Sequence, residues 1–210
     1  MVYPIVKRII FPIVRLWIKE INGINNIPRQ GPFIIAANHA SYLDHFLMGY
    51  LIIPRMNKKL HFLAKKEHFD NFLKKAWHTY GEAIPVDRER GGKKALKMAL
   101  KALNEGKIIG IHPEGTRSLT GKLQKAKTGV ARLALLAKVP VIPIGLIGTF
   151  EIMPKGKYIP KLKRAIVNVG KPMHFPKYYN KKINKRMLRE IITKIMKEIA
   201  RLSKQKYNFK

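Results

Sequence analysis

Short apolar runs that stop at polar residues recur along most of this chain. The first covers residues 33–37 and ends abruptly at Asn38. Runs of this length, bounded by polar or turn residues, predict buried strands. We expect the other strands over residues 60–64, 83–86, 108–111, 139–147 and 165–169.

Between these runs, apolar residues recur every three or four positions, which is typical of one face of a helix. Leu43, Leu47 and Leu51 follow the first strand, and we expect their helix to break at Pro54. The other helical patterns cover residues 68–80, 93–104, 130–137 and 184–202. The inward-facing residues of the last helix are Leu188, Ile191, Ile192, Ile195, Ile199 and Leu202.

Alternation of strands and helices predicts an α/β fold, with one layered domain and a mostly parallel central sheet flanked by helices. Pro140 and Pro143 fall within the strand 139–147, so its hydrogen bonding must be irregular or it must lie at an edge. We expect residues 149–163 to form a loop with exposed apolar side chains.

Residues 3–21 form an amphipathic pattern of a different kind. On a helical wheel Arg8, Arg15 and Lys19 share one narrow stripe, and apolar residues cover most of the rest. The charges interrupt the segment too often for a transmembrane span, and Pro12 predicts a kink. We therefore expect an N-terminal membrane-interface segment over 1–22, followed by a domain over 23–210. The alternative is a helix that packs on the domain core.

The composition adds a strong positive charge to this picture. The 210 residues include 43 Lys and Arg but only 12 Asp and Glu, which gives a formal net charge of +31. Such a field favours anionic partners, and a membrane surface with anionic lipids is the expected one. No nucleic-acid partner is expected, because the lysines are dispersed and no nucleic-acid-binding motif occurs. A dispersed excess of lysine is also compatible with a simple compositional bias. The absence of Cys excludes disulfides and a thiol nucleophile.

Candidate chemistry begins where the first strand ends. His39 lies two residues beyond the end of this strand, and Asp44 falls in the first turn of the helix that Ser41 opens. Across such a corner the two side chains can converge. A carboxylate beside one imidazole nitrogen fixes the tautomer and leaves the other nitrogen to act as a base. The alternative is an Asp that only caps the helix.

A second polar stretch, residues 112–118, comes after the strand 108–111. Its sequence is HPEGTRS, and it contains Glu114, Gly115, Thr116 and Arg117. Glycine lets a backbone approach a ligand closely, and Arg offers a planar fork of donors to an oxyanion. The stretch therefore predicts a phosphate-binding corner, although a lone turn of this composition is more often simply exposed.

Together the two stretches resemble the glycerolipid acyltransferase family. Residues 38–44 match its N-H-x4-D pattern, and residues 112–118 match its F-P-E-G-T-R-S pattern, with His112 in place of the usual aromatic residue. Two shorter family blocks resemble residues 84–88 and 139–144, and the four blocks occur in the family's order.

The resemblance implies an enzyme that moves a fatty acyl group from a thioester to the free hydroxyl of lysophosphatidic acid. The acyl donor would be acyl-CoA or acyl carrier protein. His39 would be the general base, Asp44 would orient it, and Arg117 would bind the acceptor phosphate. Lys65 matches a family lysine of the phosphate site, although a solvated lysine is the commoner case. Arg88 would bind phosphate or pair with its acidic neighbours.

By the same resemblance Gly115 and Thr116 belong to the substrate site, and Glu114 positions the acceptor or Arg117. Backbone amides near His39 are the candidate donors to the reaction's oxyanion. No metal or cofactor is expected, because the thioester is already activated. The expected location is the cytoplasmic face of the cell membrane.

Two other functions fit parts of the sequence. One is acyl transfer to another acceptor, such as glycerol 3-phosphate, a different lysophospholipid or an amino lipid. The other is a non-catalytic basic protein that binds membranes or nucleic acid.

Overall fold

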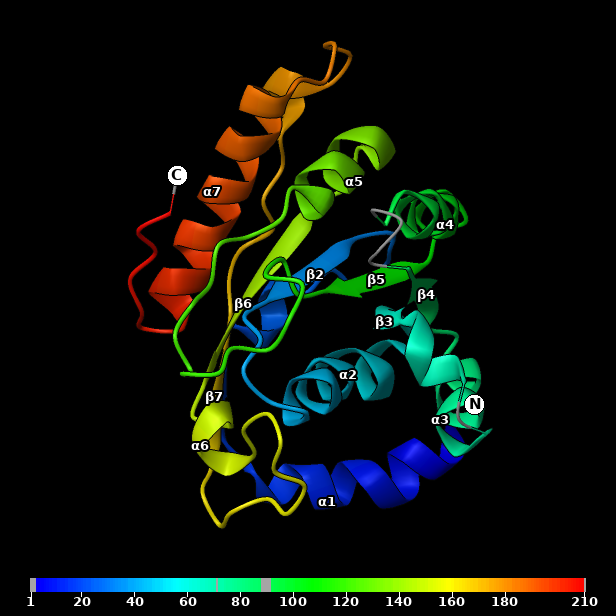
Figure 1. The fold of residues 1–210 in the computed structure, drawn as a ribbon, viewed down its shortest axis with the longest axis vertical. Helices are drawn as coiled ribbons and strands as arrows, with labels where there is room; N and C mark the ends of the chain where they lie inside the picture. Colours follow the sequence, from blue (N-terminus) through cyan, green and yellow to red (C-terminus); the bar gives the residue numbers. More distant parts are fainter. Residues whose placement is uncertain (1–2, 71, 88–91, 210) are drawn as a thin grey trace.

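A seven-stranded sheet forms the centre of the part of the chain that the computed structural model describes, residues 3–70, 72–87 and 92–209 (Figure 1). The strand order is β1-β7-β6-β2-β5-β3-β4. The strands are β1 (Ile18–Asn22), β2 (Ile34–Ala37), β3 (Leu60–Lys65), β4 (Ile84–Val86), β5 (Ile108–Ile111), β6 (Val141–Ile147) and β7 (Ala165–Val169).

The sheet is mostly parallel, as the alternation of elements predicts. Strands β6, β2, β5, β3 and β4 follow one another in the sheet, and each pair along this row is parallel. Strand β7 runs antiparallel to β6, and β1 runs parallel to β7. The central strand β2 lies between β5 and β6, so the segments at the carboxyl ends of these three strands are spatial neighbours.

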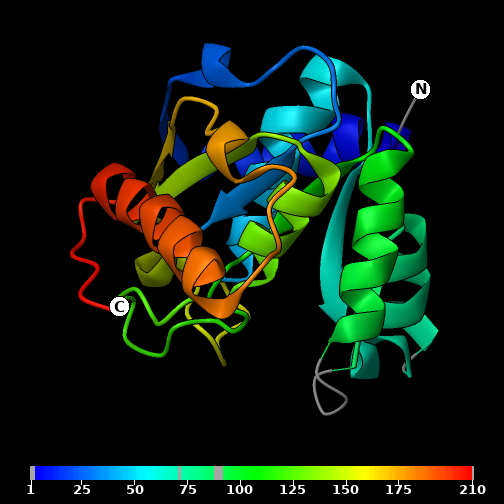
Figure 2. The same cartoon turned by 90° about the horizontal axis from the view of Figure 1, so that it is seen from above.

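Helices cover both faces of the sheet (Figures 1 and 2). The main ones are α2 (Leu43–Met56), α4 (Lys93–Asn104), α5 (Gly129–Ala137) and α7 (Lys185–Leu202). Side chains of a strand alternate between faces. Ile34 and Ala36 of β2 therefore belong to the core under α4, α5 and α7, whereas Phe33, Ile35 and Ala37 belong to the core under α2. Every side chain of β2 is thus packed in one of the two apolar cores, and this packing holds the carboxyl end of the strand in position.

The remaining helical elements lie before, between and after the strands. They are η1 (Val6–Ile10), α1 (Phe11–Leu16), η2 (Ile24–Asn26), η3 (Lys66–Phe69), α3 (Phe72–Tyr80), α6 (Thr149–Ile152) and η4 (Pro176–Tyr178). Helix α6 begins the segment that the sequence predicts as an exposed loop, and residues 155–159 and 161–164 of that segment are exposed.

Pro54 does not break α2, contrary to expectation. The helix continues to Met56 and ends where Asn57 adopts a left-handed conformation, with φ of 51°. A proline removes one backbone donor, and in the last turn of a helix the remaining bonds compensate for this loss.

Of the two alternatives for residues 139–147, irregular hydrogen bonding or an edge position, the edge position is wrong, because β6 is paired on both sides. Pro143 contributes only its carbonyl oxygen, which accepts a hydrogen bond of 2.8 Å from the amide of Gly170. Gly170 lies just beyond the end of β7. The amide N–H that Pro143 lacks would therefore face a point at which the regular pairing of β6 with β7 has already ended.

The N-terminal segment is helical only as far as Leu16. Residues 18–22 form β1, which the helical pattern did not predict, and Ile18 is buried against the sheet. A π-helical turn, η1, precedes Pro12 and accommodates the missing amide.

One side of this helical segment packs on the domain, through Val6, Phe11 and Val14. The exposed apolar residues of the same segment are Ile5, Ile9, Ile13 and Leu16. One face of the segment thus packs on the domain, as the alternative interpretation expected, and the other presents apolar side chains to the exterior. Contact of this second face with a membrane stays a prediction. Among the described residues, no helix has both the length and the apolar character that crossing a bilayer requires.

Candidate active site

Two predicted site segments meet at the carboxyl edge of the sheet. Strands β2 and β5 are parallel neighbours, with Ala36 opposite Ile111, so the residues after these strands emerge side by side. The amide of Ser118 donates a hydrogen bond of 2.8 Å to the carbonyl of His39. On the other side, the Asn38 side chain bonds both the amide and the carbonyl of Leu146 in β6. His39 is thus held between two neighbouring strands.

His39 and Asp44 form a buried pair. Nδ1 of His39 lies 2.8 Å from Oδ2 of Asp44, whose side chain is fully buried. The same oxygen accepts hydrogen bonds of 2.8 Å from the amides of Ala40 and Ser41. Asp44 therefore fastens the start of α2 and also orients the imidazole, which leaves Nε2 of His39 as the nitrogen with a free lone pair.

The Asp44 carboxyl stays ionised next to this imidazole. Burial raises its pKa, but the hydrogen bond and charge of His39, together with the other donors, outweigh burial and lower it below its usual value. An ionised carboxylate in contact with Nδ1–H stabilises the imidazolium that forms when Nε2 takes up a proton.

Glu114 braces the same corner from the second segment. Its Oε1 accepts a hydrogen bond of 2.8 Å from the amide of His39, and its Oε2 accepts one of 2.8 Å from the amide of Gln124. Burial raises the pKa of Glu114 to about 7. The carboxyl group is thus engaged with the backbone amides of His39 and Gln124, and the hydrogen bonds described for it are not with Arg117.

The backbone amides around His39 are already engaged, which argues against the predicted oxyanion donors. The amide of His39 binds Glu114, and those of Ala40 and Ser41 bind Asp44. An oxyanion donor needs an N–H that is free to bind the reacting oxygen. These three amides would have to give up buried carboxylate bonds to serve that purpose.

His112 stacks on the ring of His39. The ring centroids are 3.8 Å apart and the planes differ by 8°. Nδ1 of His112 lies 3.0 Å from the carbonyl oxygen of Ala37 and 3.1 Å from that of Asn38, so it donates to the end of β2. Burial lowers the pKa of His112 to about 3, so its ring is neutral. The histidine therefore supplies a flat ring where the family pattern has an aromatic residue.

A third histidine, His45, lies edge-on to both rings, and no motif in the sequence indicated it. Its centroid is 5.1 Å from that of His39 and 4.8 Å from that of His112. Burial lowers the pKa of His45 well below its usual value. The three residues place ring nitrogens within 4.8 Å of one another. The rings of His39 and His112 are nearly parallel, however, so their in-plane lone pairs lie in separate planes and do not converge on one metal ion in this arrangement.

Arg117 rests on an aromatic ring. Its guanidinium carbon lies 3.5 Å from the ring centroid of Tyr42, the residue just before α2. Nη1 of Arg117 is buried and has no hydrogen-bond partner among the described residues. A charged donor without a partner is costly in a protein interior and marks a place that can receive a ligand oxygen. Tyr42 lies inside the N-H-x4-D pattern at a variable position, so the motif alone did not reveal it.

Gly115 forms the turn of the second segment. Its φ of +74° is favoured by glycine, and its amide bonds the carbonyl of His112 at 3.0 Å. A Cβ at this position would lie 3.1 Å from the Lys127 side chain. Thr116 is exposed, and its carbonyl accepts a hydrogen bond of 3.1 Å from Gln124. The turn is thus fixed by its own backbone bonds.

The two remaining predicted residues are less closely tied to this site. Lys65 ends β3 at the same edge of the sheet, and its Nζ lies 3.0 Å from a carboxylate oxygen of Glu67. Arg88 lies outside the residues that the structure describes.

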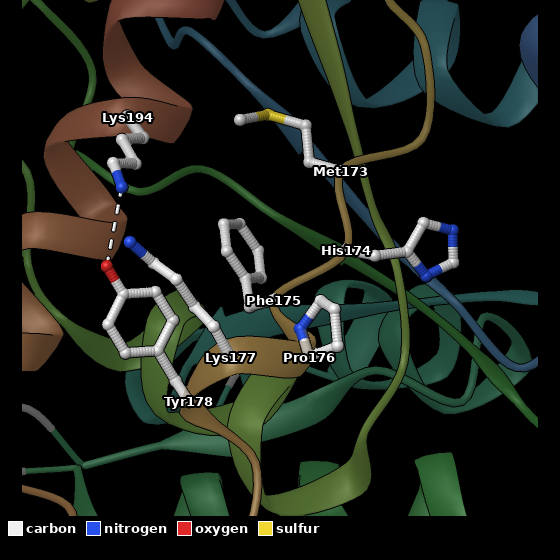
Figure 3. A pocket seen from close by; sticks show the side chains of 7 residues that line it. All are labelled: Met173, His174, Phe175, Pro176, Lys177, Tyr178 and Lys194. Carbon is white, nitrogen blue, oxygen red and sulfur yellow. Dashed lines mark hydrogen bonds between the residues drawn. The ribbon is translucent and has the colours of Figure 1, made fainter.

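An open pocket of about 380 Å³ lies elsewhere, over the start of η4 and one side of α7 (Figure 3). Lys194 reaches from α7 toward the hydroxyl of Tyr178, at 3.3 Å. None of the predicted site residues lines this pocket.

Comparisons with known proteins identify the family of this chain. The family model described as Acyltransferase matches residues 19–147. A 1-acyl-sn-glycerol-3-phosphate acyltransferase of Bacillus subtilis is 34% identical over 154 residues, which cover 71% of this chain and 70% of that protein. A protein of the same name from Streptococcus pneumoniae is 28% identical over 201 residues, which cover 92% of this chain and 70% of that protein.

The fold also matches a solved structure. The crystal structure of PlsC from Thermotoga maritima, titled as a 1-acyl-sn-glycerophosphate (LPA) acyltransferase, has a TM-score of 0.69 and 26% sequence identity. The match covers 90% of this chain and 73% of that one. The chain belongs to the acyltransferase family. Its particular relatives in that family are the 1-acyl-sn-glycerol-3-phosphate acyltransferases.

Proposed function

We propose that this chain transfers a fatty acyl group from an acyl thioester to the free hydroxyl of lysophosphatidic acid, which gives phosphatidic acid. The observation that carries the proposal is the buried His39–Asp44 pair, with 2.8 Å between Nδ1 and Oδ2, beside an Arg117 whose Nη1 lacks a partner among the described residues. The names of the relatives support the same acceptor.

In the proposed reaction, Nε2 of His39 takes the proton of the acceptor hydroxyl while the hydroxyl oxygen attacks the thioester carbonyl carbon. The carbon–sulfur bond then breaks, and the imidazolium returns its proton to the thiolate. Asp44 holds the tautomer and stabilises the imidazolium, and base catalysis of this kind supplies about 10²–10⁴-fold in rate. The thioester is already activated, so the proposed step requires no metal or cofactor.

Arg117 binds the acceptor phosphate in this mechanism, through the side of the guanidinium fork that lacks a partner. A phosphate satisfies a charged donor better than a neutral group does, because both partners are ionised. Gly115 and Thr116 shape the turn that presents Arg117, and Glu114 acts on the corner by fastening the His39 backbone. Lys65, and Arg88 outside the described residues, are further candidates for the phosphate.

The acceptor lies in a bilayer, so we further propose that the protein works at the surface of a membrane with anionic lipids. The exposed apolar side chains Ile5, Ile9, Ile13 and Leu16 support this proposal. The net charge of +31 would attract the protein to anionic lipids. Because the lipids account for this charge, we propose no nucleic-acid partner.

A transfer assay with purified protein tests the proposal. Labelled acyl-CoA and labelled acyl-acyl carrier protein are each offered with lysophosphatidic acid, glycerol 3-phosphate, lysophosphatidylcholine and an amino lipid. We expect product with lysophosphatidic acid, and an Arg117→Ala variant should raise its KM about 10-fold or more, the loss of about one charged hydrogen bond. Preference for a phosphate-free acceptor would refute the assignment.

A further inference from the structure

The segment after α6, residues 153–164, presents its apolar side chains outward. Leu162 is 100% exposed, Ile159 is 85% exposed and Tyr158 is 77% exposed. Single exposed apolar residues are common, but three within five positions form a patch that calls for a partner. The basic residues of the same segment are Lys155, Lys157, Lys161, Lys163 and Arg164, and the segment contains no acidic residue.

Both ends of this segment are fastened to structured elements. At its start, the Ser41 hydroxyl donates a hydrogen bond of 2.7 Å to the carbonyl of Met153. Near its end, Nε1 of Trp17 donates one of 3.0 Å to the carbonyl of Lys161, and Nε of Arg164 donates one of 3.1 Å to the carbonyl of Leu16. Figure 1 accordingly shows the segment and α6 beside the end of α1, below the sheet.

The segment also borders the phosphate site. The ring of Tyr158 stacks on that of Tyr42, with centroids 5.7 Å apart and planes 29° apart. Tyr42 also contacts the guanidinium of Arg117, at 3.5 Å. A hydrogen bond to Tyr42 raises the pKa of the Tyr158 hydroxyl. The exposed segment is thus connected to Arg117, the proposed phosphate-binding residue, through the ring of Tyr42.

We propose that residues 153–164 dock into the surface of an anionic bilayer and bring the acceptor lipid to Arg117. The inference rests on the proposed function for the identity of the acceptor. Ile159 and Leu162 enter the boundary between headgroups and acyl chains, and the flanking lysines contact anionic headgroups. The surface is continuous with Leu16 at the end of α1. A lipid whose tail is held there has its phosphate near Tyr158, Tyr42 and Arg117.

The bilayer suits this segment better than a second copy of this chain does, because every charge in the segment is positive. A second copy of this chain would carry the same positive charge and would be repelled. A surface of anionic lipids matches both the apolar residues and the surrounding cations.

The test uses the full chain and a double variant, Ile159→Asp with Leu162→Asp. The matched control, Met98→Asp with Leu136→Asp, introduces the same charge on exposed apolar residues of α4 and α5. Thermal unfolding by circular dichroism verifies that each protein is folded. Flotation with phosphatidylcholine vesicles, with and without phosphatidylglycerol, measures binding, and acyl transfer is measured with a vesicle-borne acceptor and with a dispersed short-chain acceptor.

We expect the loop variant to bind phosphatidylglycerol vesicles more than about 10-fold more weakly than the control, since it lacks the two apolar side chains that the bilayer would bury. Its KM for the vesicle-borne acceptor rises in parallel, while kcat and KM for the dispersed acceptor do not change. Binding equal to that of the control overturns the inference. So does a variant that changes only the oligomeric state in ultracentrifugation, which would assign the patch to a second copy of the chain.

Failure of the proposed function gives a different result. If the unaltered protein transfers no acyl group to any acceptor, the catalytic assignment fails, while flotation still reports whether residues 153–164 bind the bilayer.

Discussion

At the scale of the residue, the site depends on a few buried polar groups that hold one another. Asp44 accepts bonds from His39, Ala40 and Ser41, and Glu114 holds the His39 amide. Both carboxylates hold the backbone of this corner, and Asp44 also contacts the imidazole of His39. We expect a substitution of Asp44 to change both activity and stability, and the dependence on pH separates the two effects.

Asp44→Asn should lower acyl transfer by about 100-fold or more, because the imidazole loses its fixed tautomer. The folded-state pKa of Asp44 is below its usual value of 3.8. Its ionised form therefore contributes stability above that value, and the contribution is lost as the pH falls through the folded-state pKa. In urea unfolding, the free energy of unfolding of the wild type should exceed that of the variant by about 1–3 kcal/mol at neutral pH. This difference in the free energy of unfolding should become smaller below pH 3.8. A difference that does not depend on pH would contradict the claim that Asp44 is ionised beside His39.

Tyr42 should act through Arg117. Tyr42→Leu removes the ring under the guanidinium, and we expect KM for the phosphate-bearing acceptor to rise by about 3- to 30-fold, the range of a partly buried cation–π contact. Tyr42→Phe keeps the ring and should restore most of the affinity, with kcat little changed in both variants. If the Leu and Phe variants behave alike, the ring does not position Arg117.

At the scale of the element, the sequence predicted what local periodicity determines. Helices α4 and α7 and strands β5 and β7 have the expected positions, because their apolar patterns are uninterrupted and bounded by polar or turn residues. Strand β1 was missed because Ile18 and Ile21 are three residues apart and also fit a helix. Only its pairing with β7, over 140 residues later in the sequence, selects the strand.

Some contacts of the candidate site could also be predicted from local sequence, and others could not. The pairing of His39 with Asp44 follows from a strand-to-helix corner that the sequence shows. The position of His45, the ring contact of Tyr42 with Arg117 and the turning of Glu114 toward His39 all depend on how separate elements pack. No spacing along the chain encodes these contacts.

Close packing of β6 and α7 provides a test at this scale. A Cβ at Gly145 would lie 2.3 Å from the backbone carbon of Leu202, so Gly145→Ala should destabilise the fold by about 3 kcal/mol in urea unfolding. Gly129→Ala is the control, because its Cβ would meet only the flexible end of Leu96 at 3.3 Å in a helix. It should be neutral or stabilise by up to about 1 kcal/mol. Equal effects of the two substitutions would contradict the packing.

At the scale of the whole molecule, charge and apolar surface should act together on lipids. The net charge is +31, and both α1 and residues 153–164 carry exposed apolar side chains. Hydrogen bonds join residues 153–164 to the end of α1. Attraction between exposed charges and anionic lipids is screened by salt, with a Debye length of about 10 Å at 0.1 M. The burial of apolar side chains is not screened in this way.

Binding to phosphatidylglycerol vesicles should therefore weaken steeply as sodium chloride increases and level off at a residual binding similar to that of neutral vesicles. Flotation over a salt series measures both parts. Binding that falls to zero at high salt would show that the apolar side chains do not enter the bilayer. Binding that does not change with the salt concentration would show that the net charge does not contribute to docking.

The central claim is that Nε2 of His39 is the base in acyl transfer. Steady-state transfer of a labelled acyl group from acyl-CoA to lysophosphatidic acid by the wild type and by His39→Ala, each shown to be folded by circular dichroism, tests it most directly. We predict that the variant loses at least about 100-fold in kcat. Undiminished turnover by a folded His39→Ala protein would contradict this claim.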